Sequence, residues 1–364
     1  ARVFMRLGVI GFGGPAAHIA MMRDGLVRRR RWVTDAEFLD LVGATNLIPG
    51  PNSTELAMHL GSRRAGGRGL LVAGACFIGP AVVIVSVLAW LYADHGTDPA
   101  AVDLRYGILP VIIAIVGNAL VGLGRVSLTN PWHVVIAAAS VGGYLAGVHE
   151  LAVLLVAGTF AMLAHRRSSP GAARAHSVSM AMAVMAAATR ITQWRLFLVF
   201  LEVGSVLYGS GYVLLAFVQR NLIDELGWIT TQQLLDAIAV GQITPGPVFT
   251  TATFIGWQVH GPLGAAVATV GIFLPSFVFV ALLGRLVPWM QARPAARAFL
   301  GGVTAASLGL MAGVLIDLTD AALVDGITVA LAAGALLVLA CTRTNSAWLV
   351  GAGVVVGIAH ALAA

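Results

Sequence analysis

Residues 45–54 of this chain read Thr45-Asn46-Leu47-Ile48-Pro49-Gly50-Pro51-Asn52-Ser53-Thr54, in the middle of an apolar segment that runs from about residue 36 to residue 60. A similar stretch, Gly241-Gln242-Ile243-Thr244-Pro245-Gly246-Pro247-Val248-Phe249-Thr250-Thr251, interrupts the apolar segment 232–258. Each proline removes a backbone donor and clashes with the preceding helical turn, so neither segment continues as one regular helix. We therefore expect either a kinked span or a re-entrant pair of half-helices at each place.

The two Pro-Gly-Pro stretches belong to a large internal repeat. Gly50 and Gly246 lie 196 positions apart (246 − 50 = 196), and the same separation relates Trp32 to Trp228 (228 − 32 = 196). A constant offset without a gap indicates a duplicated unit. The sequence thus predicts three parts, which are an N-terminal domain at 1–165, a cytoplasmic linker at 166–195 and a C-terminal domain at 196–364.

Composition predicts that both domains lie in a lipid bilayer. The 364 residues are 59% hydrophobic and only 10% charged, with a mean hydropathy of +0.90. A soluble domain has about a quarter of its residues charged, and apolar stretches long enough to span a bilayer recur from one end of this chain to the other. The expected fold class is an all-α polytopic membrane protein, and the expected location is the plasma (inner) membrane.

The net charge of +6 does not indicate nucleic-acid binding. The basic run from Arg28 to Arg31 has no nucleic-acid motif beside it, and in so apolar a chain it is typical of a short cytoplasmic loop. The two cysteines, Cys76 and Cys341, form no metal-binding or redox motif. We therefore expect no nucleic-acid partner, no metal, no cofactor and no enzymatic activity.

Loop charges favour the re-entrant form of the broken segments. Basic residues lie both before the first broken segment, at 28–31, and after it, at 63–68, so both ends face the cytoplasm. Each half then has about five spanning helices, an odd number, which predicts an inverted repeat with the loops at Glu150 and Glu225 on the outer side. Arg6 does not fit this scheme, because a full first span over residues 3–22 would place it outside.

The two breaks are the expected substrate site. The half-helix that follows each Pro-Gly-Pro directs its free N–H groups and its positive dipole end at the break, which suits an anion. Paired breaks in an inverted repeat meet near the bilayer midplane. The candidate binding residues are the glycines, prolines, hydroxyls and amides of both breaks and of the glycine-rich first segments, namely Gly13, Gly14, Asn46, Pro49, Gly50, Pro51, Asn52, Ser53, Thr54, Gly209, Ser210, Gln242, Thr244, Pro245, Gly246, Pro247, Thr250 and Thr251.

Two plainer interpretations of these residues stay open. The Pro-Gly-Pro stretches could only kink their helices, with Ser and Thr hydroxyls bonded to the freed carbonyls. Most of the glycines could serve only close helix packing. We expect more of Gly13-Gly14-Pro15, which should open the first helix beside the break.

Ionisable residues inside apolar segments are costly and often functional. His18, Glu55 and Glu202 are candidates for coupling transport to a proton, with structural pairing as the alternative. Arg63 and Arg64 follow the first broken segment and could attract an anion from the cytoplasm. Positive-inside anchoring explains these two arginines equally well.

Several short motifs are similar to those of a known family. They are Phe12-Gly13-Gly14-Pro15 with Ala17-His18-Ile19, Pro49-Gly50-Pro51, Gly209-Ser210-Gly211-Tyr212, Gly241-Gln242, Thr244-Pro245-Gly246-Pro247, Thr250-Thr251-Ala252-Thr253 and Gly271-Ile272-Phe273-Leu274-Pro275-Ser276-Phe277. On these motifs the chain resembles a long, two-domain member of the chromate ion transporter (CHR) family over nearly its whole length. In the first half, Asn46 stands where a Gln is usual and Gly79-Pro80 where a Leu-Pro is usual.

The resemblance implies a secondary transporter that exports chromate from the cytoplasm and confers chromate resistance. Sulfate, another tetrahedral dianion, is the alternative small-molecule substrate, and the geometry of paired helix N-termini suits both. A membrane-embedded enzyme is a further alternative, but it would need a catalytic cluster or cofactor motif that the sequence lacks. The sequence leaves the oligomeric state open.

Overall fold

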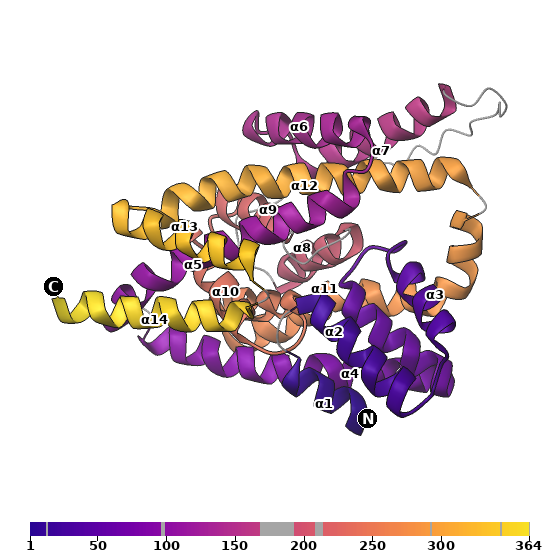
Figure 1. The fold of residues 1–364 in the computed structure, drawn as a ribbon, viewed down its shortest axis with the longest axis horizontal. Helices are drawn as coiled ribbons and strands as arrows, with labels where there is room; N and C mark the ends of the chain where they lie inside the picture. Colours follow the sequence, from indigo (N-terminus) through magenta and orange to yellow (C-terminus); the bar gives the residue numbers. More distant parts are fainter. Residues whose placement is uncertain are drawn as a thin grey trace.

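The structure is a computed structural model that describes residues 1–11, 14–95, 99–167, 193–207, 214–291, 293–342 and 344–363, and these residues contain helices and no strand (Figure 1). The helices of the first half are α1 (Arg2–Ile10), α2 (Gly14–Met22), the π-helix η1 (Arg23–Arg29), α3 (Asp35–Thr45), α4 (Asn52–His95), α5 (Pro99–Ser127), α6 (Pro131–Leu145) and α7 (Glu150–Arg167). Those of the second half are α8 (Gln193–Val206), α9 (Leu214–Val218), the π-helix η3 (Gln219–Glu225), α10 (Thr231–Ile243), the 3-10 turn η4 (Val248–Thr250), α11 (Thr251–Gln291), α12 (Pro294–Ala322), α13 (Gly326–Cys341) and α14 (Ser346–Ala363). Most of the predicted linker, 168–192, lies outside the described residues.

The helices repeat along the chain as the sequence predicts. α3 and α10 each begin with a capping box, Thr34 with Glu37 and Thr230 with Gln233, in which each side chain bonds the other residue's backbone N–H. α5 and α12 each contain 29 residues and start 195 positions apart (294 − 99 = 195). The duplicated, all-helical fold is therefore confirmed.

The first broken segment enters and leaves at the same end of the molecule. α3 leads to the break at Pro49–Pro51, and α4 carries the chain back to a tight turn at Ala65 and Gly66, where the φ of Gly66 is +59°. Arg63, beside this turn, lies 3.8 Å from the carboxylate of Glu37 at the start of α3. Because the two ends of the segment are in contact, it is re-entrant and not a kinked span.

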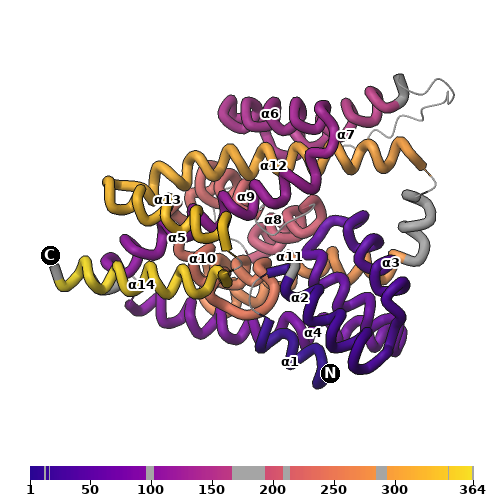
Figure 2. The backbone as a smooth tube through the Cα atoms, viewed as in Figure 1, coloured from indigo at the N-terminus to yellow at the C-terminus, as the bar shows by residue number. Residues whose placement is uncertain are grey.

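The second half repeats this hairpin at the opposite end of the molecule. α10 and the start of α11 flank the break at Pro245–Pro247, and the tight turn falls at Gly261. On α10, Asp236 accepts a hydrogen bond of 2.5 Å from Tyr92, which lies near the end of α4 that is remote from the first tight turn. The two hairpins therefore approach from opposite ends, as the positions of α3 and α10 in Figures 1 and 2 also show. This is the arrangement of an inverted repeat.

The first segment differs from the expected full span. α2 begins at Gly14, whose φ of +74° separates it from α1 as the glycine-rich sequence predicts. Phe4 packs edge-on against Trp32, with 6.1 Å between ring centroids, and the first residue of the chain shares a cavity with Arg64. Both ends of this segment therefore lie at the basic end of the molecule. Arg6 no longer conflicts with the charge rule, because its helix starts on the basic side.

The two halves interlock. α5 of the first half packs against α13 and α14 of the second, and α12 of the second half packs against α6 and α7 of the first (Figure 1). Glycines allow the closest of these approaches: a Cβ on Gly107 or Gly353 would collide with the other residue's carbonyl oxygen. The helices at the end of each half thus complete the packing of the other half.

The surface fits a lipid solvent. Among the described residues, four helices are long and apolar enough to cross a membrane: Asn52–His95, Val102–Ser127, Val248–Leu283 and Pro294–Ala322. Shorter apolar helices are Glu150–His165, Gly326–Cys341 and Ser346–Leu362. Large apolar side chains such as Trp90, Val156 and Trp348 are exposed on the outside, where acyl chains would cover them. The chain is a multi-pass membrane protein.

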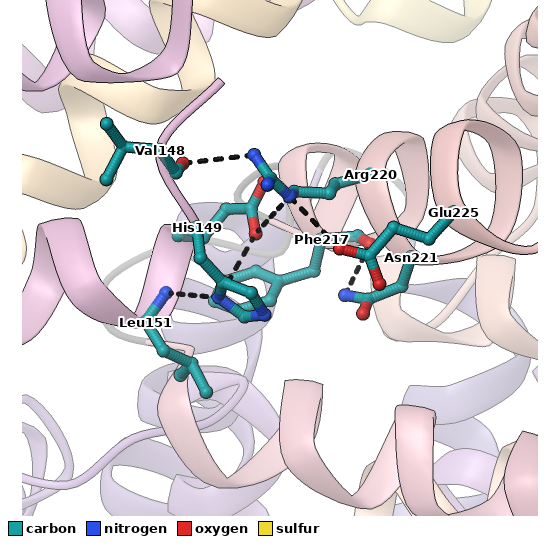
Figure 3. Close-up of polar contacts among 8 residues, drawn as sticks. Val148, His149, Leu151, Phe217, Arg220, Asn221 and Glu225 are labelled. Atoms are coloured by element: carbon teal, nitrogen blue, oxygen red, sulfur yellow. Dashed lines mark hydrogen bonds and ion pairs between the residues drawn. The ribbon is translucent and has the colours of Figure 1, made fainter. Parts of the chain in front are cut away.

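A polar cluster joins loops that the sequence predicts to share the outer side (Figure 3). Arg220 on η3 lies 3.8 Å from Glu150 and 3.3 Å from Glu225. Its Nη1 donates a hydrogen bond of 3.1 Å to the carbonyl of Val148. Glu150 belongs to the first half and the other two charged residues to the second. The cluster therefore brings acidic loops of both halves together, in agreement with the predicted sidedness.

Candidate substrate site

Each Pro-Gly-Pro break is fastened to the other half of the chain. The N–H of Gly50 donates a hydrogen bond of 2.7 Å to the carbonyl of Leu207, and the N–H of Gly246 donates one of 2.8 Å to the carbonyl of Gly11. The two acceptors are themselves repeat-equivalent (207 − 11 = 196) and lie where the first segment of each half is interrupted. The glycine N–H groups of the breaks are thus satisfied by carbonyls of the interrupted first segments of the opposite halves, as a lipid environment requires.

Both central glycines are needed for this arrangement. The φ of Gly50 is +135° and that of Gly246 is +102°, which side chains rarely adopt. A Cβ on Gly50 would collide with the carboxylate of Glu55 and lie 2.5 Å from the hydroxyl of Ser276. A Cβ on Gly246 would lie 2.7 Å from the Cβ of Ala81. Each break is therefore pressed against the long helix of the other half.

The first break is surrounded by polar side chains. Asn52 donates a hydrogen bond of 2.6 Å to the side chain of Asn46. His18 is buried, with Nε2 at 2.9 Å from the carbonyl of Gly11 and Nδ1 at 3.1 Å from the hydroxyl of Ser53. Since a carbonyl only accepts, Nε2 carries the proton and the neutral Nδ1 accepts from Ser53.

The half-helix after the first break offers the features that an anion needs. The leading N–H groups of an α-helix have no intrahelical partner, and its N-terminus is the positive end of the dipole. Thr54 and Glu55 in this first turn are 0% exposed. Within the described part of the chain, the Thr54 hydroxyl has no hydrogen-bond partner, and the Glu55 carboxylate has only the hydroxyl of Ser276 within reach. The buried hydroxyl of Thr54 therefore remains available to donate a hydrogen bond to a ligand.

The second break has a different set of side-chain contacts. The hydroxyls of its three threonines donate to backbone carbonyls of their own turns, Thr244 to Val240 at 2.6 Å, Thr250 to Pro247 at 2.8 Å and Thr251 to Val248 at 2.8 Å. For these three residues the structure has the plainer arrangement, in which hydroxyls bond to carbonyls freed by the break. The backbone N–H groups at the start of the following half-helix remain as donors for an anion.

The remaining predicted residues are distributed as follows. Gly13, Gly209 and Ser210 lie outside the described residues. Gln242 is half-buried near the end of α10, and Glu202 is half-buried in α8. Arg63 and Arg64 are exposed at the far end of the returning half-helix, where Arg63 meets Glu37 and Arg64 lies 5.5 Å over the ring of Trp32. These two arginines therefore do not contact either break.

The sequence did not indicate the partners of two residues, Ser276 and Asp236. Ser276, buried on α11, reaches the first break from the other half. Its motif was noticed, but no sequence signal pairs it with Glu55. Asp236 on α10 is also bound by Arg105, with 3.1 Å between Nε and the carboxylate. Its buried ion pair could not be inferred, because Arg105 stands 131 positions away (236 − 105 = 131).

A separate cavity of about 450 Å³ lies between α6, α7 and α12. Its lining includes the cationic or titratable side chains of His133, His165 and Arg297. None of the residues that line it belongs to either break. The breaks, and not this cavity, hold the paired helix N-termini.

Interrupted membrane helices that meet across an inverted repeat define the architectural class of secondary transporters. The chain belongs to the chromate transporter family, since the model of the family described as "Chromate transporter" matches residues 1–163 and again residues 194–358. Each half of the chain therefore carries one copy of the family's domain.

Curated relatives agree with this membership. The chain is 31% identical to a chromate transport protein of Cupriavidus metallidurans over 332 residues, which cover 88% of this chain and 82% of that protein. It is 30% identical to a chromate transport protein of Pseudomonas aeruginosa, with 87% of this chain and 80% of the relative covered. A probable chromate transport protein of Synechococcus elongatus is 29% identical, with 88% and 84% covered. No solved structure matches the chain.

Proposed function

We propose that this chain is a secondary transporter that exports chromate from the cytoplasm across the plasma membrane and thereby confers chromate resistance. The family membership and the names of three relatives support chromate as the substrate. The observation that carries the proposal is that each break is hydrogen-bonded to the interrupted first segment of the other half, Gly50 to Leu207 and Gly246 to Gly11. It gives one membrane-embedded region with two helix N-termini.

The chemistry of the region suits a tetrahedral dianion. Backbone N–H groups at a helix N-terminus bind oxyanions without a neutralising side chain. The hydroxyl of Thr54 and the N–H groups at Asn52 and Ser53 would donate from the first half-helix. Hydrogen bonds to a charged acceptor are stronger than those between neutral groups. The candidate site residues of both breaks would enclose the substrate in this way.

Basic residues favour substrate entry from the cytoplasm. Arg63, Arg64 and Arg68 are exposed around the tight turn of the first hairpin, at the end where the sequence predicts the cytoplasm. A positive surface raises the local concentration of a dianion. Export would then begin with chromate moving from this surface to the first break.

Transport in this proposal needs no chemical change of the substrate. Cys76 is half-buried and Cys341 is exposed, and both are free thiols far from each other in the sequence. A Cys76→Ser, Cys341→Ser double variant should therefore keep full chromate resistance when it is present at normal abundance in the membrane. A loss of resistance under that condition would favour reduction by the protein over export.

Sulfate is the alternative substrate, because it has the same shape and charge as chromate. The test is uptake of radiolabelled chromate into proteoliposomes with the purified chain, with unlabelled sulfate as competitor. We expect protein-dependent chromate flux that sulfate inhibits only in excess. Sulfate flux without chromate flux would reassign the substrate, and flux of neither ion would contradict the proposed function.

A further inference from the structure

The two breaks carry different side chains at equivalent positions. Glu55 follows the first break, and its repeat counterpart after the second break is Thr251 (251 − 55 = 196). After the breaks the offset between the halves falls to 195, as the tight-turn glycines Gly66 and Gly261 show (261 − 66 = 195). Ser276 contacts the first break from α11, and its counterpart at the second break is therefore Ala81 (276 − 81 = 195). The backbone of the site is thus symmetric, but its ionisable chemistry belongs to the first break alone.

Glu55 is enclosed in an unusual way for a carboxylate. Its side chain is 0% exposed, and so is that of Ser276. The carboxylate and this hydroxyl converge on the space above Gly50, where a Cβ would touch both. Among the described residues, the hydroxyl of Ser276 is the one hydrogen-bonding partner within reach of this carboxylate. Burial of a carboxylate without a countercharge is costly, so it favours the protonated form of Glu55.

The elements packed against this part of α4 supply no cation for Glu55. The neighbouring titratable groups are His18 on α2, which bonds Ser53 and Gly11, His59 one turn further along α4, Glu37 on α3, which meets Arg63, and Asp236 on α10, which is held by Tyr92 and Arg105. The α1 helix also packs against α4, and its two cations, Arg2 and Arg6, are exposed on the surface. α11 offers Ser276 and, at its tight turn, His260. None of these groups forms an ion pair with Glu55 in the described part of the chain.

The Glu55 carboxylate and a bound dianion would compete for the same helix N-terminus. The positive end of the half-helix at residues 52–64 faces the break, and Glu55 lies in its first turn. A dianion bound there would meet the Glu55 carboxylate at close range, where like charges in a low-dielectric site repel strongly. The two negative groups therefore exclude each other unless Glu55 takes up a proton.

We propose that Glu55 is the proton-binding residue of the substrate site, so that the oxyanion binds only while Glu55 carries a proton. This inference rests on the proposed function, because it requires an oxyanion at the first break. It makes substrate binding depend on a proton and places the site of that proton within the first half. Ser276, from the second half, would hydrogen-bond the protonated carboxyl and connect its state to the packing of α11 on α4.

Proton uptake upon binding is the direct test. Purified full-length chain in weak buffer at pH ~8, where chromate is itself a dianion, is mixed with chromate while a pH indicator is followed. The mixing is repeated at rising pH, and above the pKa of Glu55 we expect the parent chain to take up about one proton per chromate bound and Glu55→Gln to take up none. The matched control is Asp94→Asn, which makes the same change at an exposed carboxylate on the same helix and should leave the uptake unchanged.

The affinity gives a second readout. Chromate should bind the parent chain up to about tenfold more weakly for each pH unit above the pKa of Glu55. Glu55→Gln should bind chromate at all pH values as tightly as the parent chain does at low pH. Proton uptake that persists in Glu55→Gln, or an affinity set by sodium and not by pH, would overturn the inference.

An infrared difference spectrum covers the case in which Glu55→Gln does not fold. Chromate binding to the parent chain should produce the carbonyl band of a protonated carboxyl, shifted in Ser276→Ala. Chromate binding without such a band would overturn the proton site but leave the proposed function standing. A parent chain that binds neither chromate nor sulfate would instead refute the proposed function.

Discussion

The two breaks of this protein share the same backbone features but differ in the chemistry of their side chains. Each has a positive-φ glycine between prolines, a cross-half hydrogen bond from that glycine and a returning half-helix. At the first break the buried side chains His18, Ser53 and Glu55 are polar. At the second, the positions of the first two carry Leu214 and Phe249 (214 − 18 = 196, 249 − 53 = 196).

The shared backbone and the different side chains of the two breaks indicate separate roles for backbone and side-chain groups. The backbone arrangement depends on Pro, Gly and a lipid solvent, so both halves need it equally. The side chains that titrate or lack a partner are needed only once, because a single substrate needs a single coupling group. We expect backbone variants to affect both breaks alike and side-chain variants to separate them.

Replacing either central glycine should have the largest effect. Gly50→Val and Gly246→Val each force a side chain into positive φ, a strain of about 1–3 kcal/mol, and into a contact that leaves no space. We expect both to reduce chromate flux in proteoliposomes by tenfold or more. Gly79→Val, at a helical glycine with open space, is the control. Normal flux in only one of the two variants would mean that the breaks are not equivalent in backbone function.

The inverted orientation of the two breaks predicts opposite labelling. Single cysteines at Arg29→Cys and Glu225→Cys, in a chain with Cys76→Ser and Cys341→Ser, should differ in reaction with a membrane-impermeant thiol reagent. Both parent side chains are accessible, at 70% and 44% relative exposure, so access to water does not limit the reaction. We expect strong labelling of the Glu225 position in intact cells and little at Arg29. Equal labelling of both would refute the inverted repeat.

Two equivalent threonines should respond in opposite ways. Thr250 donates to the carbonyl of Pro247, so Thr250→Val should lower the free energy of unfolding by about 0.5–1.5 kcal/mol. Thr54 is buried without a partner, so Thr54→Val should be neutral or stabilising. If Thr54 donates to the oxyanion, its loss should weaken binding by about tenfold, from a contribution of ~1.5–3 kcal/mol.

Thermal unfolding and chromate binding of both variants measure these effects. The comparison would fail if Thr250→Val lost more affinity than Thr54→Val, because the second break would then hold the stronger donor. Ser140→Ala, a buried hydroxyl bonded to its own helix away from the breaks, controls for the loss of a hydroxyl.

The smallest difference should be in the helix caps that lead to the breaks. Hydrogen bonds from the backbone N–H and the hydroxyl of Thr34, together with Arg63, lower the pKa of Glu37. A lowered pKa stabilises the fold above the unfolded value of ~4.3, and the contribution is lost as the pH falls through the folded value. The equivalent cap on α10 uses Gln233, which does not titrate.

Hydrogen exchange of the two helices would measure this effect. Amide protection in α3, corrected for intrinsic exchange, should fall between pH ~5 and pH ~3, while protection in α10 should not. Glu37→Gln should make α3 as insensitive to pH as α10. A pH-dependent α3 in Glu37→Gln would assign the effect to another carboxylate.

Local and compositional rules were enough for much of this fold. A chain with 10% charged residues has to use lipid as its solvent, and Pro-Gly-Pro has to interrupt a helix wherever it stands. The constant offset between Gly50 and Gly246 established the duplication, and loop charge indicated the re-entrant hairpin. Charge did not resolve the first segment, because the positions of Phe4 and Trp32 relative to each other depend on how α1 packs.

The sequence by itself determined the class of the protein, its repeat and the place of its breaks, because covalent geometry and solvation act on each segment separately. Only the tertiary structure decided that Gly50 bonds to Leu207, that Thr250 bonds to its own turn, and that Glu55 meets Ser276 without a countercharge. The contacts of Gly50 with Leu207 and of Glu55 with Ser276 join residues from different halves. Thr250 has several possible acceptors within reach, and packing decides which of them it bonds. These contacts follow from how the helices pack, and the pattern of residues along each helix does not specify that packing.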